Sequence, residues 1–361
     1  MHTTKLLPHS PSQSRTATRS SWSEWSAYAA GIWSAVYACL GLLWANGYPG
    51  FPFGSGVSGT AASSLWYRAD AEVGGAVIAL TGMLGVLVAL LIARGRGVQV
   101  QLPQLAFAWS ASVTLLVLVP DARALVAVAY APVFVLGAPF GWPPVSYSKA
   151  IPWPVINQLL CIVGGLLWGA TALGHGRRTR GACAACGRSN DERGWTSPQS
   201  AAHWGRWATY AAMAIPIGYA TTRFAWALGL PLGISEAFLR EGRAAGMWTA
   251  GAALGAVAVA GALLTFGLIR PWGEVFPRWI PAIGGKRVPL ATAIAPAAFV
   301  AALVTSAGFG VVRSVAATGL KGGWGARGPG LLWPLWGLAL GVATLAYYYR
   351  RRGPCSECGR G

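Results

Sequence analysis

Charged side chains are scarce in this chain, and acidic ones are the scarcest. Only 11% of the 361 residues are charged, and Asp and Glu together number 10. Because a soluble protein averages about 25% charged residues, the composition excludes an ordinary soluble domain. Hydrophobic residues make up 54% of the chain, and apolar stretches long enough to cross a bilayer core of about 30 Å recur along it. The sequence therefore predicts an all-α membrane protein.

Groups suited to acid–base or nucleophilic chemistry are also rare. The chain has four histidines, two of which, His2 and His9, lie in the N-terminal tail. The sequence contains no phosphate-binding loop, no Ser/His/Asp set and no paired carboxylates within an apolar span. Since general acid–base catalysis needs positioned groups of these kinds, nothing in the sequence argues for an enzyme, although none of this excludes one.

The N-terminus lacks the short apolar segment and cleavage site of a secretory signal peptide. Residues 1–24 are instead polar and rich in Ser and Thr, a composition typical of disorder. We therefore expect no removed signal peptide and a disordered cytoplasmic tail over 1–24.

Eight apolar segments are long enough to form transmembrane helices, and a ninth is ambiguous. The ninth, 122–139, could cross the bilayer, or it could be re-entrant or lie at the interface. The eight predicted spans are 26–46, 72–93, 104–119, 154–173, 207–229, 246–269, 289–312 and 331–348.

The distribution of Lys and Arg decides between these topologies, because cytoplasmic loops carry the excess of basic residues. With eight spans and a cytoplasmic N-terminus, 19 basic residues lie inside and 9 outside. If 122–139 also crosses, the numbers become 12 inside and 16 outside. Eight spans are therefore predicted, with both termini in the cytoplasm and 122–139 re-entrant or interfacial.

The net charge of +18 does not by itself indicate nucleic acid. The basic residues lie between apolar spans, where they orient the protein and contact anionic lipid. We expect no nucleic-acid partner, and a bilayer with anionic lipid at the cytoplasmic face.

The two halves of the chain resemble each other. A shift of 182 residues without gaps gives 10 identities in the 25 positions from Trp25 to Pro49, including Trp25 with Trp207 and Trp44 with Trp226. A shift of 172 aligns the ends of the halves, where "RGACAACGR" (180–188) falls on "RGPCSECGR" (352–360). The sequence therefore predicts a tandem duplication, with a first repeat over 25–188, a cytoplasmic linker over 189–206 and a second repeat over 207–361.

Four spans in each repeat imply parallel repeats, because an even number of crossings returns the chain to the same side. Parallel repeats related by an axis along the membrane normal occur in transporters. The same parity places both cysteine pairs in the cytoplasm. The segment 122–139 then belongs to the first repeat alone, since the matching region 313–330 is too polar to cross.

Four of the six cysteines form two matched C-x-x-C-G-R units. Cys183 and Cys186 end the first repeat, and Cys355 and Cys358 end the second. Two such pairs offer four thiolates, the ligand count of a structural tetrahedral zinc site. We therefore expect these four cysteines to bind zinc and to clasp the repeats.

Other interpretations of the cysteines stay open. C-x-x-C also supports thiol–disulfide exchange, and two copies of the chain could share a metal in a dimer. Cys39 and Cys161 stand alone within spans, where a cysteine usually acts as a small hydrophobic residue.

An outer-facing polar site is a further hypothesis. Arg223 lies within a span, about six residues from its outer end, and intramembrane charge often marks function. It could snorkel outward or form a site with outer acids, which are Asp70, Glu72, Glu236 and Glu241.

Two smaller expectations concern polar residues near the ends of spans. Asn157 and Gln158 are expected to form helix–helix hydrogen bonds. In the inner loop 270–289, Glu274 and Arg278 are four residues apart and would pair if that segment is helical.

Three stretches carry a resemblance to a known class of proteins. "YPGFPFG" after the first span, "WGEVFPRWIP" in the inner loop and arginine-rich ends running into "CGR" resemble uncharacterised multi-pass membrane proteins of actinobacterial genomes. The resemblance implies a bacterial plasma membrane and implies no activity.

Three functions remain open at this point. The first is a structural or regulatory membrane protein whose repeats are clasped by a cytoplasmic zinc site. The second is a transporter or channel for a small solute, with a path between the repeats. The third is a membrane redox protein that uses the four cytoplasmic thiols.

Overall fold

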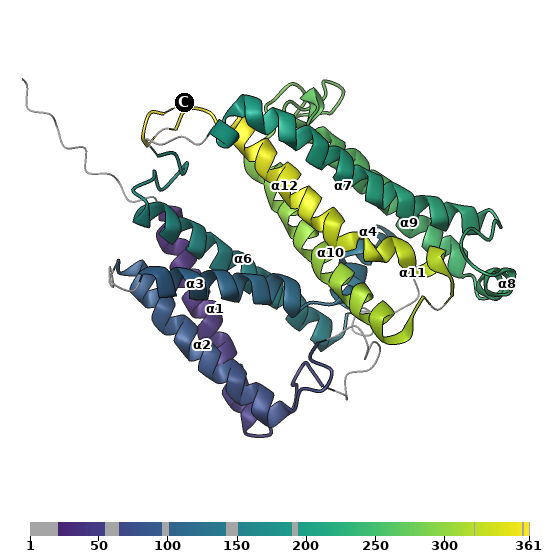
Figure 1. Ribbon diagram of the computed structural model, residues 1–361, viewed down its shortest axis with the longest axis horizontal. Helices are drawn as coiled ribbons and strands as arrows, with labels where there is room; N and C mark the ends of the chain where they lie inside the picture. The colour runs from purple at the N-terminus through teal and green to yellow at the C-terminus, as the bar shows by residue number, and fades with distance from the viewer. Residues whose placement is uncertain are drawn as a thin grey trace, which may run out of the picture.

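The computed structural model shows a protein built from long helices (Figure 1). Most of the predicted tail lies outside the described residues, but Ser21 already begins the first helix, so the tail is shorter than 1–24. The described residues are 21–54, 65–95, 101–141, 151–189, 194–320, 322–355 and 357–360.

The first half of the chain forms a bundle of four long helices. Helix α1 packs against α2 and α6, and α3 packs against α6. Helix α3 ends in a π-helical segment, η2. The bounds are α1 Ser21–Ala45, α2 Ala71–Ala93, α3 Gln101–Val113, η2 Thr114–Leu118 and α6 Trp153–Thr179.

The second half forms a second bundle of four long helices, beside the first (Figure 1). Helix α7 packs against α9 and α12, and α10 packs against α12. Taken in chain order, these are the same pairings as in the first half. The bounds are α7 Pro198–Ala227, α9 Met247–Gly267, α10 Leu290–Thr318 and α12 Trp333–Arg351.

Shorter helices connect the long ones. The described residues contain no β-strand beyond a single antiparallel bridge between Val275 and Arg287. The short helices are α4 Ala122–Gly137, α8 Glu236–Ala244 and α11 Trp324–Leu331, with 3-10 turns η3 Ala138–Phe140, η4 Gly194–Thr196 and η5 Pro271–Gly273.

Seven helical segments of the described chain are long and apolar enough to cross a membrane. They coincide with seven of the eight predicted spans. Helix α7, the remaining one, is 30 residues long, but its tyrosines, threonines and Arg223 lower its hydropathy. The seven are Trp25–Ala45, Ala71–Ala93, Gln101–Leu118, Trp153–Thr179, Met247–Gly267, Leu290–Thr318 and Trp324–Arg351.

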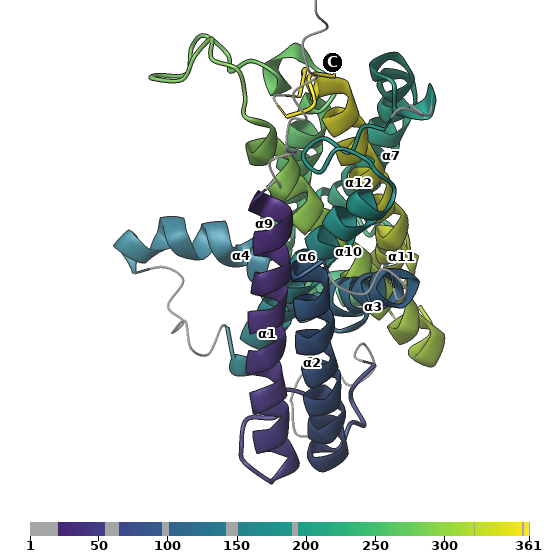
Figure 2. The same ribbon diagram turned by 90° about the vertical axis from the view of Figure 1, so that its left-hand side faces the viewer.

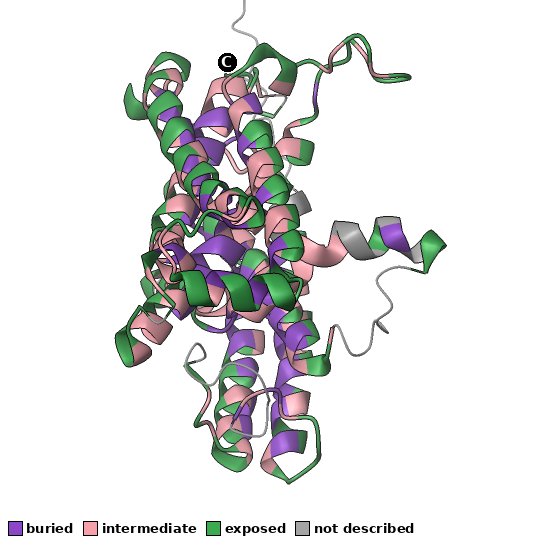
Figure 3. Ribbon diagram, turned by 90° about the vertical axis from the view of Figure 1, so that its right-hand side faces the viewer, coloured by how far each residue is buried: buried purple, intermediate pink, exposed green. Residues whose placement is uncertain are grey.

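Large apolar side chains cover the outside of these bundles, as expected of a surface that meets lipid. Ile32 is 68% exposed, Leu80 63% and Leu264 70%. Buried residues lie between the helices, and exposed ones run along their outward faces (Figure 3). This distribution supports the membrane class that composition predicts.

Small residues let α1 and α2 approach closely. A Cβ atom added at Gly41 would lie 2.5 Å from the backbone nitrogen of Ala79, and one at Gly75 would lie 2.5 Å from that of Ala45. Without a hydrophobic driving force between helices in lipid, such close packing supplies much of the association energy. These two helices therefore depend on glycine at the crossing.

Helix α4 occupies the segment whose crossing was ambiguous. It has 16 residues, and its apolar part, Ala122–Ala131, is shorter than a span. It projects sideways from the bundles rather than running along α1 and α2 (Figure 2). Helix α4 contacts α6 of the first half and both α9 and α10 of the second, so it connects the two bundles.

The inner loop corrects one expectation. Glu274 does not pair with Arg278; its Oε1 atom lies 2.7 Å from Nη2 of Arg350, on α12. Pro271 and Pro277 interrupt the segment, and the backbone from Val275 folds back to form its bridge instead of a helix. The i, i+4 geometry that the pairing required is therefore absent.

Candidate metal centre

The four cysteines predicted as ligands meet beyond the ends of α6 and α12. Cys183 and Cys186 follow α6, and Cys355 and Cys358 follow α12. The Sγ atoms of Cys183 and Cys355 lie 3.8 Å apart, those of Cys186 and Cys358 lie 3.6 Å apart, and all four lie within 4.8 Å of one another. Tetrahedral coordination with metal–sulfur bonds of about 2.3 Å separates sulfurs by about 3.8 Å. The four sulfurs are therefore close enough to hold one metal ion.

The first cysteine pair lies on a tight turn. The N–H of Cys183 donates to the carbonyl of Arg188 at 2.9 Å, and the N–H of Gly187 donates to the carbonyl of Cys183 at 2.8 Å. The N–H of Arg188 also points at Sγ of Cys186, 3.5 Å away. The turn thus presents both sulfurs on one side and aims a backbone donor at one of them.

The second turn repeats the backbone bonds of the first. The N–H of Cys355 donates to the carbonyl of Arg360 at 2.9 Å, and the N–H of Gly359 donates to the carbonyl of Cys355 at 2.8 Å. Gly359 has a φ of 70°, and its counterpart Gly187 has a φ of 74°. Both lie in the left-handed region that glycine occupies without strain, which explains the glycine after each second cysteine.

Arg188 joins the two turns. Its side chain is 5% exposed, and its Nη1 atom donates to the carbonyls of Gly353 at 3.0 Å and Arg360 at 2.6 Å. Its Nη2 atom donates to the carbonyl of Arg352 at 3.2 Å. In the reverse direction, Nη1 of Arg360 donates to the carbonyl of Arg188 at 3.4 Å. Hydrogen bonds thus join the two turns, and the sulfurs of the two turns lie close together.

The thiols differ in how readily they ionise. Backbone N–H donors of Cys358 and Glu357 lower the pKa of the Cys355 thiol to about 7. Burial raises the pKa of the Cys186 thiol to about 12, against the opposing effect of the Arg188 N–H. Without a bound cation, ionisation of the Cys186 thiol is therefore less favourable than ionisation of the Cys355 thiol.

A divalent cation fits the donor set and its surroundings. Four thiolates around one divalent ion leave a charge of −2, and buried Arg188 is among the arginines next to the turns. Such outer groups commonly stabilise charged metal sites. All six cysteines are free, and sulfurs 3.6–3.8 Å apart are well beyond the disulfide bond length of about 2.05 Å.

Comparison with known proteins does not assign the site. Protein-family models, curated proteins and solved structures give no match to this chain. The resemblance to actinobacterial membrane proteins stays an expectation from the sequence. The site is therefore interpreted from its own geometry.

Arg223 lies among aromatic rings and carbonyls. Its guanidinium carbon lies 4.3 Å from the ring centroids of both Tyr219 and Trp226. Its Nη1 atom donates to the carbonyl of Gly325 at 3.3 Å, and Nη2 donates to that of Ala326 at 3.4 Å. Cation–π contacts and carbonyl bonds of this kind hold a guanidinium in place without an acid.

No hydrogen bond among the described residues joins Arg223 to any of the four outer acids. Asp70 caps α2 by accepting from the N–H groups of Glu72 and Val73 at 3.0 and 3.2 Å. Glu236 begins α8, and Glu241 lies near its end. No ion pair among the described residues joins any of them to Arg223, so a shared outer-facing site stays a prediction.

A partly buried ion pair that sequence reasoning missed lies between the two bundles. Asp121, which is 1% exposed, precedes α4 and accepts from Nη2 of Arg123 at 2.6 Å. The backbone N–H of Asp121 donates to Oε1 of Gln158 on α6 at 3.1 Å. The hydroxyl of Ser306 on α10 donates to the carbonyl of Pro120. This short segment therefore binds to both halves, and the charged Asp121 between two apolar stretches was the signal available in the sequence.

Asn157 forms the interhelical bond expected of it, whereas Gln158 accepts from the backbone of the segment before α4 and not from another helix. The hydroxyl of Tyr37 on α1 donates to Oδ1 of Asn157 on α6 at 2.8 Å. Cys161 is buried nearby, with Sγ 3.7 Å from the same hydroxyl, whereas Cys39 is exposed. Neither of these cysteines belongs to the four-sulfur cluster.

Proposed function

We propose that this is a structural or regulatory protein of the bacterial plasma membrane whose two halves are clasped by one zinc ion. The observation that carries the proposal is that four sulfurs, two from each half, lie within 4.8 Å of one another. The zinc would fix the ends of α6 and α12 relative to each other. Zinc would therefore stabilise the protein by strengthening the docking of its two halves.

The ligand set favours zinc in a structural role. Tetrahedral sites with four thiolates select zinc or iron–sulfur centres, and a closed set of four protein ligands leaves no position for water or substrate. Two sulfur contacts join opposite halves, Cys183 with Cys355 at 3.8 Å and Cys186 with Cys358 at 3.6 Å. This favours a metal shared by both turns over a dithiol/disulfide couple within one turn.

The helix pairings support the proposed duplication into two parallel four-helix repeats. In chain order, α1, α2, α3 and α6 correspond to α7, α9, α10 and α12, and the pairings match member for member. Helix α7 is then the eighth transmembrane helix, because it packs against two candidate spans, α9 and α12. The equivalent residues Trp44 and Trp226 are both 3% exposed, which supports the same correspondence.

The proposed orientation places the cysteine cluster and both termini in the cytoplasm. It rests on the excess of Lys and Arg that the eight-span topology puts on that side. Reducing conditions there keep thiols available for metal. The same basic residues would contact anionic lipid at the cytoplasmic face.

Metal analysis of purified protein tests the clasp. Wild-type protein should contain about one zinc per chain, and the double variant Cys183→Ser with Cys355→Ser should lose it, because two thiolates cannot complete a tetrahedral site. Cys39→Ser is the matched control, since that cysteine lies outside the cluster, and it should keep its zinc. One zinc per chain in the double variant would refute the clasp.

Thiol trapping in cells separates the clasp from the redox alternative. Zinc-bound thiolates should stay reduced when cells are treated with a mild oxidant, because the metal protects them from oxidation. A redox couple should form a disulfide under the same treatment and release it on recovery. Reversible disulfide formation among the four cysteines would favour the redox function over the clasp.

A further inference from the structure

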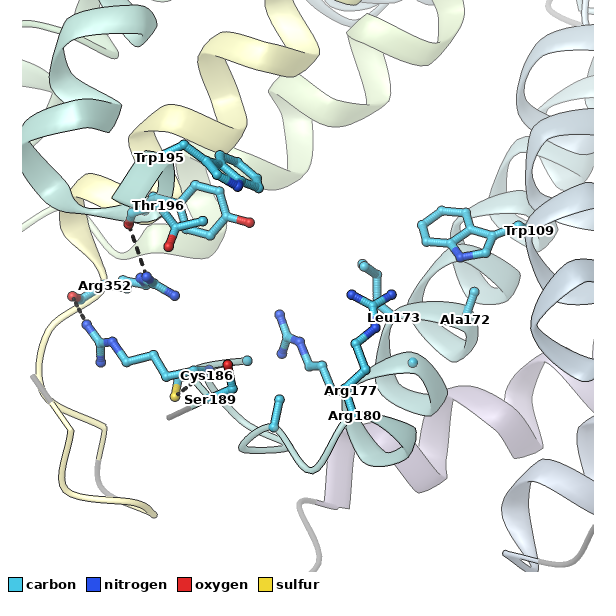
Figure 4. A pocket seen from close by; sticks show the side chains of 15 residues that line it. Trp109, Ala172, Leu173, Arg177, Arg180, Cys186, Ser189, Trp195, Thr196 and Arg352 are labelled. Carbon is cyan, nitrogen blue, oxygen red and sulfur yellow. Dashed lines mark hydrogen bonds between the residues drawn. The ribbon is translucent and has the colours of Figure 1, made fainter. Parts of the chain in front are cut away.

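A cavity of about 240 Å³ lies against the first cysteine turn. Its walls come from the end of α6, the segment around η4, the end of α12 and one residue of α3 (Figure 4). It therefore lies at the joint between the two halves. We call it the arginine pocket, after the four arginines that line it, Arg177, Arg180, Arg188 and Arg352.

The arginine pocket is strongly basic. None of its lining residues within the described chain is acidic. Two arginines hold their places by donating to backbone carbonyls: Arg177 to those of Ala184 and Ala185 at 3.1 and 2.9 Å, and Arg188 to the second cysteine turn. These bonds hold the two guanidinium groups at the wall, and together with Arg180 and Arg352 they give the pocket a positive field.

Arg180 and Arg352 occupy equivalent positions in the two halves, 172 residues apart. Arg180 is exposed, and its side chain makes no hydrogen bond within the described residues. Nη2 of Arg352 donates to the carbonyl of Thr196 at 3.1 Å, and its guanidinium carbon lies 4.8 Å from the ring centroid of Tyr349. The Nε atom of Arg352 is buried with no partner, so this side chain has an unused donor at the pocket wall.

The far end of the arginine pocket is apolar. Leu173 lies on α6, seven residues before Arg180, the residue that directly follows this helix. Seven residues correspond to about 10 Å along a helix. Leu173 and Trp109 of α3 are both exposed, and Figure 4 shows them on the side of the pocket away from Arg352. Both belong to candidate membrane spans. The pocket therefore changes from cationic to apolar in the direction of the bilayer core.

We propose that the arginine pocket binds an anionic phospholipid, with its phosphate between Arg180 and Arg352 and its acyl region along Leu173 and Trp109. Guanidinium groups match phosphate oxygens in geometry and charge, and basic pockets between helices at the cytoplasmic face suit such headgroups. A free phosphate ion would use the arginines alone and leave the apolar end unfilled. This assignment rests on the cytoplasmic orientation proposed above, and it makes the lipid a second link between the halves.

Lipid binding to the full-length protein tests the proposal. Protein in a neutral detergent is titrated with phosphatidylglycerol or phosphatidylcholine, and retained lipid is counted by native mass spectrometry. The pocket variant is Arg180→Gln with Arg352→Gln. The control is Arg278→Gln with Arg287→Gln, which removes the same charge from exposed positions in the inner loop. Zinc content is measured for each variant, so that loss of the clasp is seen separately from loss of lipid.

The expected result is selective retention of phosphatidylglycerol by the wild type and the control. Each arginine near an anionic lipid contributes about a factor of five, so the pocket variant should bind about 30-fold more weakly. If the pocket variant also loses zinc, the single change Arg180→Gln should still weaken binding about fivefold, because that side chain makes no bond within the described residues. If phosphatidylglycerol binding weakens equally in the pocket and control variants, the effect depends on net charge alone, and the proposed lipid site is refuted.

Inorganic phosphate distinguishes the two sources of the phosphate group. Phosphate at millimolar concentration should leave bound phosphatidylglycerol in place, since it cannot replace the apolar contacts. Displacement of the lipid by inorganic phosphate at an affinity similar to that of the lipid would overturn the assignment to phospholipid. Equal binding of phosphatidylcholine would also overturn it, because the choline cation opposes the pocket's charge.

Discussion

At the scale of single residues, the cysteine turns depend on two glycines. Gly187 and Gly359 have φ values of 74° and 70°, and a side chain in the left-handed region costs roughly 1–2 kcal/mol. Gly359→Ala should therefore weaken zinc binding by about 5–30-fold, measured by competition with a chromophoric chelator. Gly187→Ala should weaken it further, because its Cβ would lie 2.9 Å from Nε of Arg177.

Gly353→Ala is the control for these glycines. Gly353 precedes the second turn and does not have a positive φ. A Cβ added there would have no neighbour within 4 Å. Its zinc affinity should match the wild type. An unchanged affinity in Gly359→Ala would show that the metal does not require the turn seen here.

The residue scale also shows what the sequence could predict of the site. The four cysteines were predictable because their spacing and their position at equivalent ends of two similar segments are visible without coordinates. The bonds of Arg188 to the opposite turn and the partner of Glu274 were not. Each depends on how segments about 160 or 76 residues apart in the sequence meet in space, and no local pattern encodes that contact.

At the scale of helices, the contact between α1 and α2 is limited by backbone approach. A Cβ at Gly75 would lie 2.5 Å from the backbone nitrogen of Ala45, so Gly75→Ala must push the helices apart. Overpacking of this kind costs about 1–3 kcal/mol, and the thermal unfolding midpoint in detergent should fall.

Gly261→Ala on α9 provides the matched comparison for Gly75. A Cβ there would have no neighbour within 4 Å, and alanine is favoured over glycine in helices by about 1 kcal/mol. Its unfolding midpoint should be equal to or above that of the wild type. A fall of the same size in both variants would show that loss of glycine, and not the close crossing, is responsible.

The segment before α4 contributes a second element-scale prediction. Asp121→Asn removes the buried partner of Arg123, and hydrogen bonds to charged groups contribute about 1.5–3 kcal/mol. The free energy of unfolding should fall by about that amount. Because Arg123 is itself 21% exposed, the lower half of the range is expected.

A double-mutant cycle isolates this pair. Arg123→Gln alone should also destabilise the protein, and the double variant should lose less than the sum of the two, with a coupling of about 0.5–3 kcal/mol. Strict additivity would mean that the Asp121 carboxylate acts through Arg313, which it also attracts, rather than through Arg123.

The helices themselves were largely predictable, since apolar length identifies a span almost independently of packing. That 122–139 is re-entrant or interfacial was predicted only from the topology that keeps basic residues on one side, and it stays a prediction. The structure shows that α4 projects sideways from the bundles (Figure 2). Its role in joining the bundles was not foreseen, because that role rests on Asp121, Gln158 and Ser306, which come from three separate segments.

At the scale of the whole molecule, three features join the halves at different levels. The polar segment around Asp121 contacts both bundles between their helices, the cysteine cluster joins the ends of α6 and α12, and the arginine pocket lies beside that cluster. Removing zinc with a chelator should therefore loosen the ends of the helices and leave the bundles folded. The central claim is that one metal ion takes two sulfurs from each half.

X-ray absorption at the zinc edge tests that claim most directly. The wild-type protein should show four sulfur neighbours at about 2.3 Å and no nitrogen or oxygen ligand. Cys183→Ser with Cys355→Ser should abolish the zinc signal, while Cys39→Ser should leave it unchanged. A shell with fewer than four sulfurs, or a zinc signal that survives in the double variant, would contradict the account.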